Sequence, residues 1–124
     1  NPLGCAAALK SMELLETQSG KLGQIESWHR EGLARLAAAP GLERARVCGT
    51  IAAVDFEGGG AAEYQGPAST AMRTMFLERG YLLRPIGNAI YLLPPFCIER
   101  RQMEAVYACI AEVCGDYLKG VGSA

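Results

Sequence analysis

A single arginine, Arg84, stands between two apolar runs in the stretch LLRPIGNAIYLLPP, which covers residues 82–95. Withdrawing a guanidinium group from water is costly unless an anion satisfies it. Its planar fork of N–H donors suits a carboxylate, which it binds through two parallel hydrogen bonds. The residues alone leave three partners open: a carboxylate of this chain (Glu57, Glu63 or Glu78), water at the end of a hairpin, or a carboxylate on a ligand.

Tyr91 is the second candidate site residue, because it follows Arg84 beyond the turn-forming stretch PIGN. A hairpin closed by this turn would bring the two side chains near each other across the strands. The alternative interpretation is a half-buried strand aromatic with no role in binding, and position alone favours that alternative.

Other chemical motifs are missing from the sequence. It contains no glycine-rich phosphate loop followed by Lys-Ser/Thr and no G-x-S-x-G elbow. The stretch GGGAAEYQG at 58–66 predicts a flexible loop by its composition, and its GGGAAE part is not a dinucleotide-binding fingerprint, because it does not open a clear helix. Lys10, Lys21 and Lys119 lie where exposed helices or a frayed terminus are expected, so none is expected to be a desolvated nucleophile. On its own residues, the chain is a poor candidate for a complete enzyme.

Metal and disulfide chemistry are also disfavoured. The five cysteines, at positions 5, 48, 97, 109 and 114, form no C-x-x-C pair, and His29 has no neighbouring ligand to complete a zinc site. We therefore expect buried, reduced thiols in a cytoplasmic protein and no metal. Trp28 and His29 are expected to pack within a helix, and Asp55 and Glu57 to form a solvent-facing charged pair.

The composition is typical of one globular domain: 124 residues, 50% hydrophobic and 20% charged, with a net charge of −1. This balance gives no basic surface for nucleic acid and no polybasic stretch for a membrane. No apolar run approaches the ~20 residues of a spanning helix. The first residues carry no charged region of a signal peptide.

The hydrophobic periodicity predicts an α+β domain of two layers, a small, mostly antiparallel sheet with helices on one face. Proline and glycine residues mark where the helices and strands are expected to begin and end. The expected elements are a helix from Asn1 to the stretch TQSG, a helix over 21–39, one or two strands over 45–57 bent at Gly49, a short helix over 67–79, strands YLLR (81–84) and AIYLL (89–93) paired as a hairpin, and a helix over 99–119.

Two segments carry a family resemblance. NPLGCAAALKSMELLE, at residues 1–16, resembles the NPLACAAALASLELLE stretch of class III (ω-type) pyridoxal-phosphate aminotransferases. ERGYLLRPIGNAIYLLPPFCI, at 78–98, is similar to the more specific RP-x-G-x-x-IYLMPPY-x-I signature of the diaminopelargonic acid synthase family within that class. The similarity covers nearly the whole chain in family order, and the loop at 58–66 is its least family-like part.

The resemblance implies a role for both candidate residues. In that family the arginine of RP-x-G binds the carboxylate of 8-amino-7-oxononanoate, which maps onto Arg84, and the tyrosine of IYL lines the substrate pocket, which maps onto Tyr91. The implied reaction transfers an amino group from S-adenosylmethionine to give 7,8-diaminononanoate in biotin synthesis, in a cytoplasmic homodimer. Pyridoxal phosphate supplies the electron sink.

The resemblance also implies that much of the enzyme lies outside this sequence. The Schiff-base lysine and most cofactor-binding residues of the family precede the NPL segment, so no catalytic or cofactor-binding residue is expected here. We interpret 1–18 as the last helix of a large cofactor-binding domain and 19–124 as the small domain of a fold-type I aminotransferase, inactive alone. Two alternatives stay open: another ω-aminotransferase acting on ornithine or acetylornithine, against which IYLLPP argues, and a free-standing, non-catalytic binding or oligomerisation module.

Overall fold

The computed structural model describes residues 1–57 and 66–121, so all but the last residue of the loop predicted at 58–66 lies outside the described residues. The elements follow the predicted order closely. They are α1 (Pro2–Thr17), α2 (Ser19–Leu36), β1 (Leu42–Cys48), β2 (Ile51–Phe56), α3 (Pro67–Glu78), β3 (Ala89–Leu92) and α4 (Arg100–Val121).

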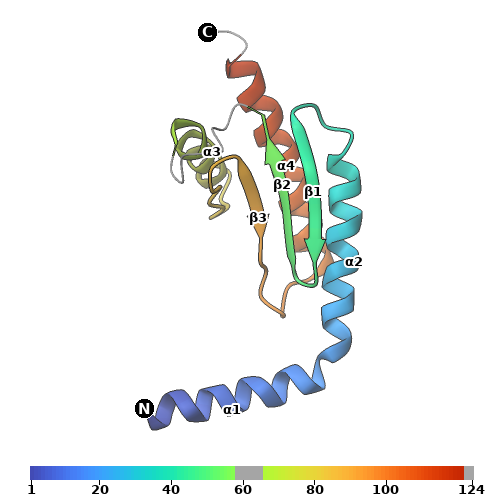
Figure 1. Cartoon of the computed structure of the whole chain (residues 1–124), viewed down its shortest axis with the longest axis vertical. Coiled ribbons are helices and arrows are strands. Elements are labelled where there is room, and N and C mark those ends of the chain that lie inside the picture. Colours follow the sequence, from blue (N-terminus) through green and yellow to red (C-terminus); the bar gives the residue numbers. More distant parts are fainter. Residues whose placement is uncertain (58–65, 122–124) are drawn as a thin grey trace.

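The sheet is antiparallel, with strand order β1-β2-β3. The region predicted as one or two strands forms a hairpin of two, which turns at Gly49, where φ is +56°. Helices α2 and α4 cover one face of this sheet, and α3 packs beside β3 against α4 (Figure 1). The predicted α+β architecture of two layers is therefore confirmed.

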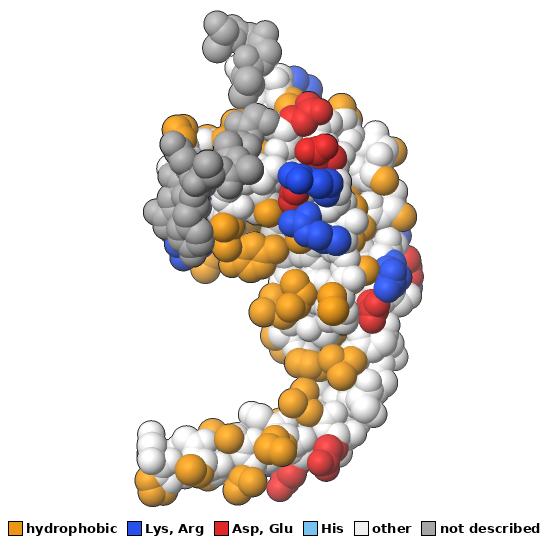
Figure 2. Space-filling view, in the orientation of Figure 1, with side chains coloured by type: hydrophobic (Ala, Val, Ile, Leu, Met, Phe, Trp, Pro, Cys, Tyr) orange, Lys and Arg blue, Asp and Glu red, His pale blue; other side chains and the backbone are white. Residues whose placement is uncertain are grey.

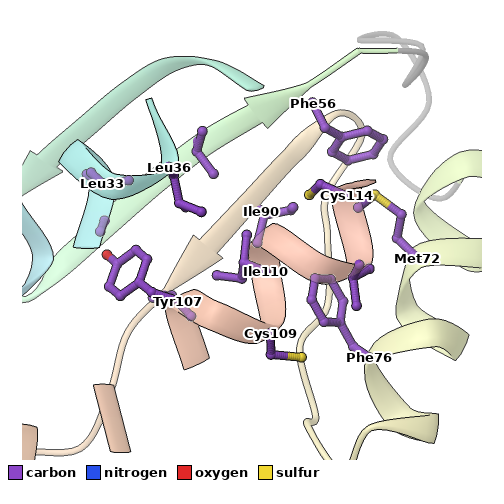
Figure 3. Packing of buried hydrophobic residues seen from close by; sticks show 14 of the residues in the cluster. Leu33, Leu36, Phe56, Met72, Phe76, Ile90, Tyr107, Cys109, Ile110 and Cys114 are labelled. Atoms are coloured by element: carbon purple, nitrogen blue, oxygen red, sulfur yellow. The ribbon is translucent and has the colours of Figure 1, made fainter. Parts of the chain in front are cut away.

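The core lies between the sheet and the helices (Figure 3). Alternate residues of β2 point toward the helices, as expected for a strand with one buried face: Ala52, Val54 and Phe56 are almost fully buried. The stripe predicted on the last helix meets them, with Met103, Tyr107, Ile110, Val113 and Cys114 buried and Val106 and Tyr117 half-buried. Burial of this apolar surface supplies the main favourable free energy of folding.

The predicted hairpin between residues 81–84 and 89–93 is wrong. Residues 81–85 form no strand, and β3 pairs instead with β2, where Tyr91 lies opposite Ala53. The tight turn closes only one bridge, in which Ile86 N donates to Ala89 O and Ala89 N to Ile86 O, both at 2.9 Å. Beyond this bridge the two segments separate, and Pro85 and the residues before it form no ladder with β3.

Helix α1 projects away from the body of the molecule (Figure 1), and none of its residues is buried. Asn1 caps it, accepting from Leu3 N and Gly4 N, as the Asn-Pro start predicts. Its exposed apolar side chains are visible along the projecting arm (Figure 2) and include Leu3, Leu9 and Met12. Among the described helices, none is long and apolar enough to cross a membrane.

The cysteine prediction is correct for two residues and wrong for three. Cys109 and Cys114 are buried in the core, and burial raises the pKa of both thiols. Cys5 on α1, Cys48 at the end of β1 and Cys97 in the turn before α4 are exposed. None of the five forms a disulfide with another cysteine.

His29 packs within its helix as predicted, with no exposed surface, and its two ring nitrogens are satisfied inside the chain. Nδ1 lies 2.8 Å from the Tyr107 hydroxyl and Nε2 lies 3.0 Å from the Thr50 carbonyl oxygen. A carbonyl only accepts, so Nε2 carries the proton and Nδ1 accepts from Tyr107. Burial lowers the pKa of His29, which the hydrogen bond to Thr50 partly opposes.

Candidate functional site

An apolar cavity of about 310 Å³ lies beside β3 and contains both candidate site residues. Its walls come from the segment before the turn, from β3 and the prolines after it, and from the start of α4. The lining residues are Leu82, Leu83, Arg84, Tyr91, Leu92, Leu93, Pro94, Pro95, Ile98, Met103 and Val106. Every member except Arg84 and the tyrosine hydroxyl is apolar, so the cavity suits an aliphatic chain.

The cavity exists where the predicted hairpin does not form. A ladder between residues 81–84 and 89–93 would hold the two backbones about 4.8 Å apart. Instead, Leu83 and Leu92 come from separate segments of the chain, and both line the apolar cavity. The structure thus brings Arg84 and Tyr91 to the same cavity, although not across a ladder. Tyr91 is 37% exposed, and Arg84 is exposed at the rim.

A second, polar hollow of about 290 Å³ shares Arg84 with the apolar cavity. The other residues that line it are Ser69, Thr70, Arg73 and Pro85. Arg84 therefore stands where an apolar cavity and a polar hollow meet. This is the arrangement that a ligand with an aliphatic body and an anionic end requires. Sequence reasoning missed Arg73, although its spacing from Ser69 and Thr70 places all three on one face of α3.

The prediction that Asp55 faces solvent is wrong. Asp55 is buried, with 4% of its surface exposed. Arg44 Nη2 lies 2.8 Å from Oδ2 and Arg46 Nη1 lies 2.9 Å from Oδ1. An irregularity in the β1–β2 register, with Arg44 at a φ of +49°, accompanies this arrangement of two arginines on one carboxylate. Basic and acidic side chains gather over β1 and β2 in Figure 2. Glu57 is exposed, as predicted.

The lysines of this chain do not fit a Schiff base with pyridoxal phosphate. Lys10 lies 2.7 Å from Glu13, Lys21 lies over the Trp28 ring at 4.5 Å from its centroid, and Lys119 lies 3.5 Å from Asp116. None of them lines the apolar cavity or the polar hollow. Within residues 1–57 and 66–121, no group of His, Cys, Asp and Glu could hold a metal ion either.

Known proteins resemble the chain in sequence. It is 43% identical over 118 residues to the adenosylmethionine-8-amino-7-oxononanoate aminotransferase of Synechococcus elongatus, which covers 94% of this chain and 27% of that protein. It is 28% identical over 120 residues to a rice protein named bifunctional dethiobiotin synthetase/7,8-diamino-pelargonic acid aminotransferase, covering 86% of this chain and 15% of that one. The chain spans about a quarter of the length of the first of these relatives.

Solved structures share the fold. An ω-transaminase from Pseudomonas jessenii, in complex with PMP, superposes with a TM-score of 0.81 at 25% identity, over 98% of this chain and 28% of that one. A family model described as Aminotransferase class-III matches residues 1–114. The chain therefore belongs to the class III aminotransferase family.

Proposed function

We propose that this chain is part of a pyridoxal-phosphate-dependent aminotransferase of biotin synthesis. The complete enzyme transfers an amino group from S-adenosylmethionine to 8-amino-7-oxononanoate and releases 7,8-diaminononanoate. The names of the relatives support this reaction, and the stretch RPIGNAIYLLPP is the sequence feature that favours it. Pyridoxal phosphate binds elsewhere in the enzyme, because the lysines here do not fit it.

Residues 1–18 belong, in this proposal, to a large cofactor-binding domain, and residues 19–124 form the small domain. The exposed apolar side chains of α1 support this division, since a helix with no buried residue contributes little to the core of the small domain. The complete enzyme is a homodimer in this interpretation, and the chain alone is inactive. Borohydride treatment of this chain with pyridoxal phosphate is expected to leave no stoichiometric lysine adduct; a specific adduct would contradict the assignment.

The observation that carries the proposal is the position of Arg84 at the apolar cavity. The acceptor is a medium-length aliphatic chain that ends in one carboxylate. Its methylene groups match the leucines and prolines of the walls, and Arg84 offers the fork of donors for its acidic end. Tyr91 contributes an aromatic wall to the same cavity.

Kinetics of Arg84→Gln in the complete enzyme test this assignment. A hydrogen bond to a charged group contributes about 1.5–3 kcal/mol, so we expect kcat/KM for 8-amino-7-oxononanoate to fall at least about tenfold. The methyl ester of the acceptor should show little difference between the two enzymes, because it carries no anion. The matched control is Arg101→Gln, since Arg101 is an exposed arginine that pairs with Glu99 away from the cavity.

Three outcomes would overturn the proposal. Equal kcat/KM for the acid in Arg84→Gln and the unsubstituted enzyme would remove Arg84 from substrate binding. A preference of the complete enzyme for ornithine or acetylornithine over 8-amino-7-oxononanoate would assign the chain to another ω-aminotransferase. So would the use of glutamate in place of S-adenosylmethionine as the amino donor.

A further inference from the structure

We propose that Arg73 is a second anion-binding residue, which together with Arg84 binds the terminal carboxylate of the amino acceptor. This inference rests on the proposed function and extends it. It assigns a role to the polar hollow beside the apolar cavity and to a residue of α3 that lies outside the sequence signature.

The geometry starts from α3. Ser69, Thr70 and Arg73 are spaced i, i+1 and i+4, so their side chains lie on one side of the helix. All three line the hollow of about 290 Å³ into which Arg84 also reaches. The Ser69 hydroxyl already donates to the Gly66 carbonyl at 2.9 Å, which leaves the arginines as the main donors to a ligand there.

The charges of the hollow favour an anion. Two guanidinium groups line it, and none of the described residues around it is acidic. Like charges around one small volume repel each other, and an anion between them reverses the sign of that interaction. Within the described part of the chain, Arg73 makes no hydrogen bond and no ion pair, so its donors are available for such a ligand.

The adjoining apolar cavity identifies the kind of anion. Because Arg84 lines both spaces, an anion held between Arg73 and Arg84 lies at the end of a cavity whose other walls are leucine, proline, isoleucine, methionine, valine and tyrosine. A free inorganic anion would make no use of those walls. A carboxylate on an aliphatic chain uses both spaces at once. The ligand is therefore the acidic end of an ω-carboxylated aliphatic substrate.

The test compares Arg73→Gln and Arg73→Lys in the complete enzyme with the acid and its methyl ester as acceptors. We expect Arg73→Gln to raise KM for the acid about five- to tenfold, with kcat nearly unchanged, since a bound carboxylate loses one of two cations. The ester should show no such change, and Arg73→Lys should recover part of the affinity for the acid. KM for the amino donor should stay constant.

A merely structural role for Arg73 would change the kinetics of the acid and the ester alike, and that result would overturn the inference. So would an increase in KM for the amino donor alone. If Arg84→Gln raises KM for the acid and Arg73→Gln does not, the proposed function stands and this inference fails. If neither variant distinguishes acid from ester, the proposed function fails with it. Arg101→Gln again serves as the control for loss of a surface charge.

Discussion

Two pairs of arginines in this molecule have different surroundings. Arg44 and Arg46, on β1, both contact the buried carboxylate of Asp55, at 2.8 and 2.9 Å. Arg73 and Arg84, on α3 and on the segment before β3, line a hollow around which no described residue is acidic. The first pair has its counter-charge within the sheet. The second pair surrounds a space large enough for a ligand's carboxylate.

The difference separates charges that the fold itself pairs from charges that we propose bind a ligand. Asp55 and His29 are both buried polar residues with partners inside the chain, although Oδ1 of Asp55 has only its ion pair with Arg46 and no hydrogen bond. Buried polar groups need such partners, because an unsatisfied one costs about 1–3 kcal/mol. Arg84 is exposed and lines the apolar cavity, where we propose that a ligand reaches it. Substitutions of Asp55 or His29 should therefore change the stability of the fold, and substitutions of the arginines at the polar hollow should change ligand binding.

The largest effect on stability is expected for a substitution of Gly32, which packs against the ring of Tyr107. A Cβ atom at this position would overlap the ring of Tyr107, whose hydroxyl is held by His29. We expect Gly32→Ala to lower the free energy of unfolding by about 3 kcal/mol, because overpacking forces the ring or the helices apart. Urea unfolding followed by circular dichroism measures the change.

Gly23→Ala is the matched control in the same helix. Apart from the adjacent residues and the backbone of the helix itself, no atom lies within 4 Å of a Cβ built at Gly23, which is exposed. This substitution should stabilise the protein by about 0.5–1 kcal/mol through the higher helix propensity of alanine. Equal effects of the two substitutions would mean that the α2–α4 contact is not tightly packed.

The next largest effect is expected for Asp55→Asn. The amide keeps the shape of the carboxylate but leaves Arg44 and Arg46 close together without a negative charge. Both arginines are more than half exposed, so solvent screens part of the loss, and we expect about 2 kcal/mol rather than the full cost of breaking a buried pair. Glu43→Gln removes a neighbouring exposed carboxylate that lies 4.0 Å from Arg44, and it should change the unfolding free energy little. A loss no larger than that control's would contradict the structural role of Asp55.

Most of the fold could be predicted from local sequence patterns. The Asn-Pro start of α1, Pro67 at the start of α3 and the apolar stripe of α4 each depend on neighbouring residues, and each is confirmed. The hairpin prediction failed because strand pairing depends on distant partners. Residues 89–92 pair with β2, and nothing within LLRPIGNAIYLLPP specifies that choice.

The site could be predicted only in part, for the same reason. Arg84 is conspicuous in the sequence because it interrupts an apolar run, and the structure places it with Tyr91 at one cavity. Arg73 is one of many charged residues on helix surfaces, and only the packing of α3 beside residues 84–85 brings it to the hollow. Asp55 was misassigned because its arginine partners lie on the neighbouring strand, at an irregularity in the pairing.

A smaller effect follows from pH. Burial lowers the pKa of His29 from its ordinary value of 6.5, so the folded state favours the neutral ring. Below pH 6.5, the unfolded chain therefore binds more protons at His29 than the folded protein does. The contribution of the neutral ring to stability is complete above pH 6.5, and it is lost as the pH falls through the lowered pKa of His29 in the folded protein. Urea unfolding at a series of pH values should show this decline. The variant His29→Gln should show a shallower decline; an equal slope would mean that other groups cause it.

The smallest effect on stability is expected for the substitutions that most affect binding. Arg73 and Arg84 are exposed, and exposed charges contribute little to folding because water solvates them well in both states. Arg73→Gln and Arg84→Gln should each change the unfolding free energy by no more than about 0.5 kcal/mol, while Asp55→Asn costs about 2. A loss near 2 kcal/mol at Arg84 would place its main partner inside the fold. The two pairs of arginines would then serve the same purpose, and the difference between them would disappear.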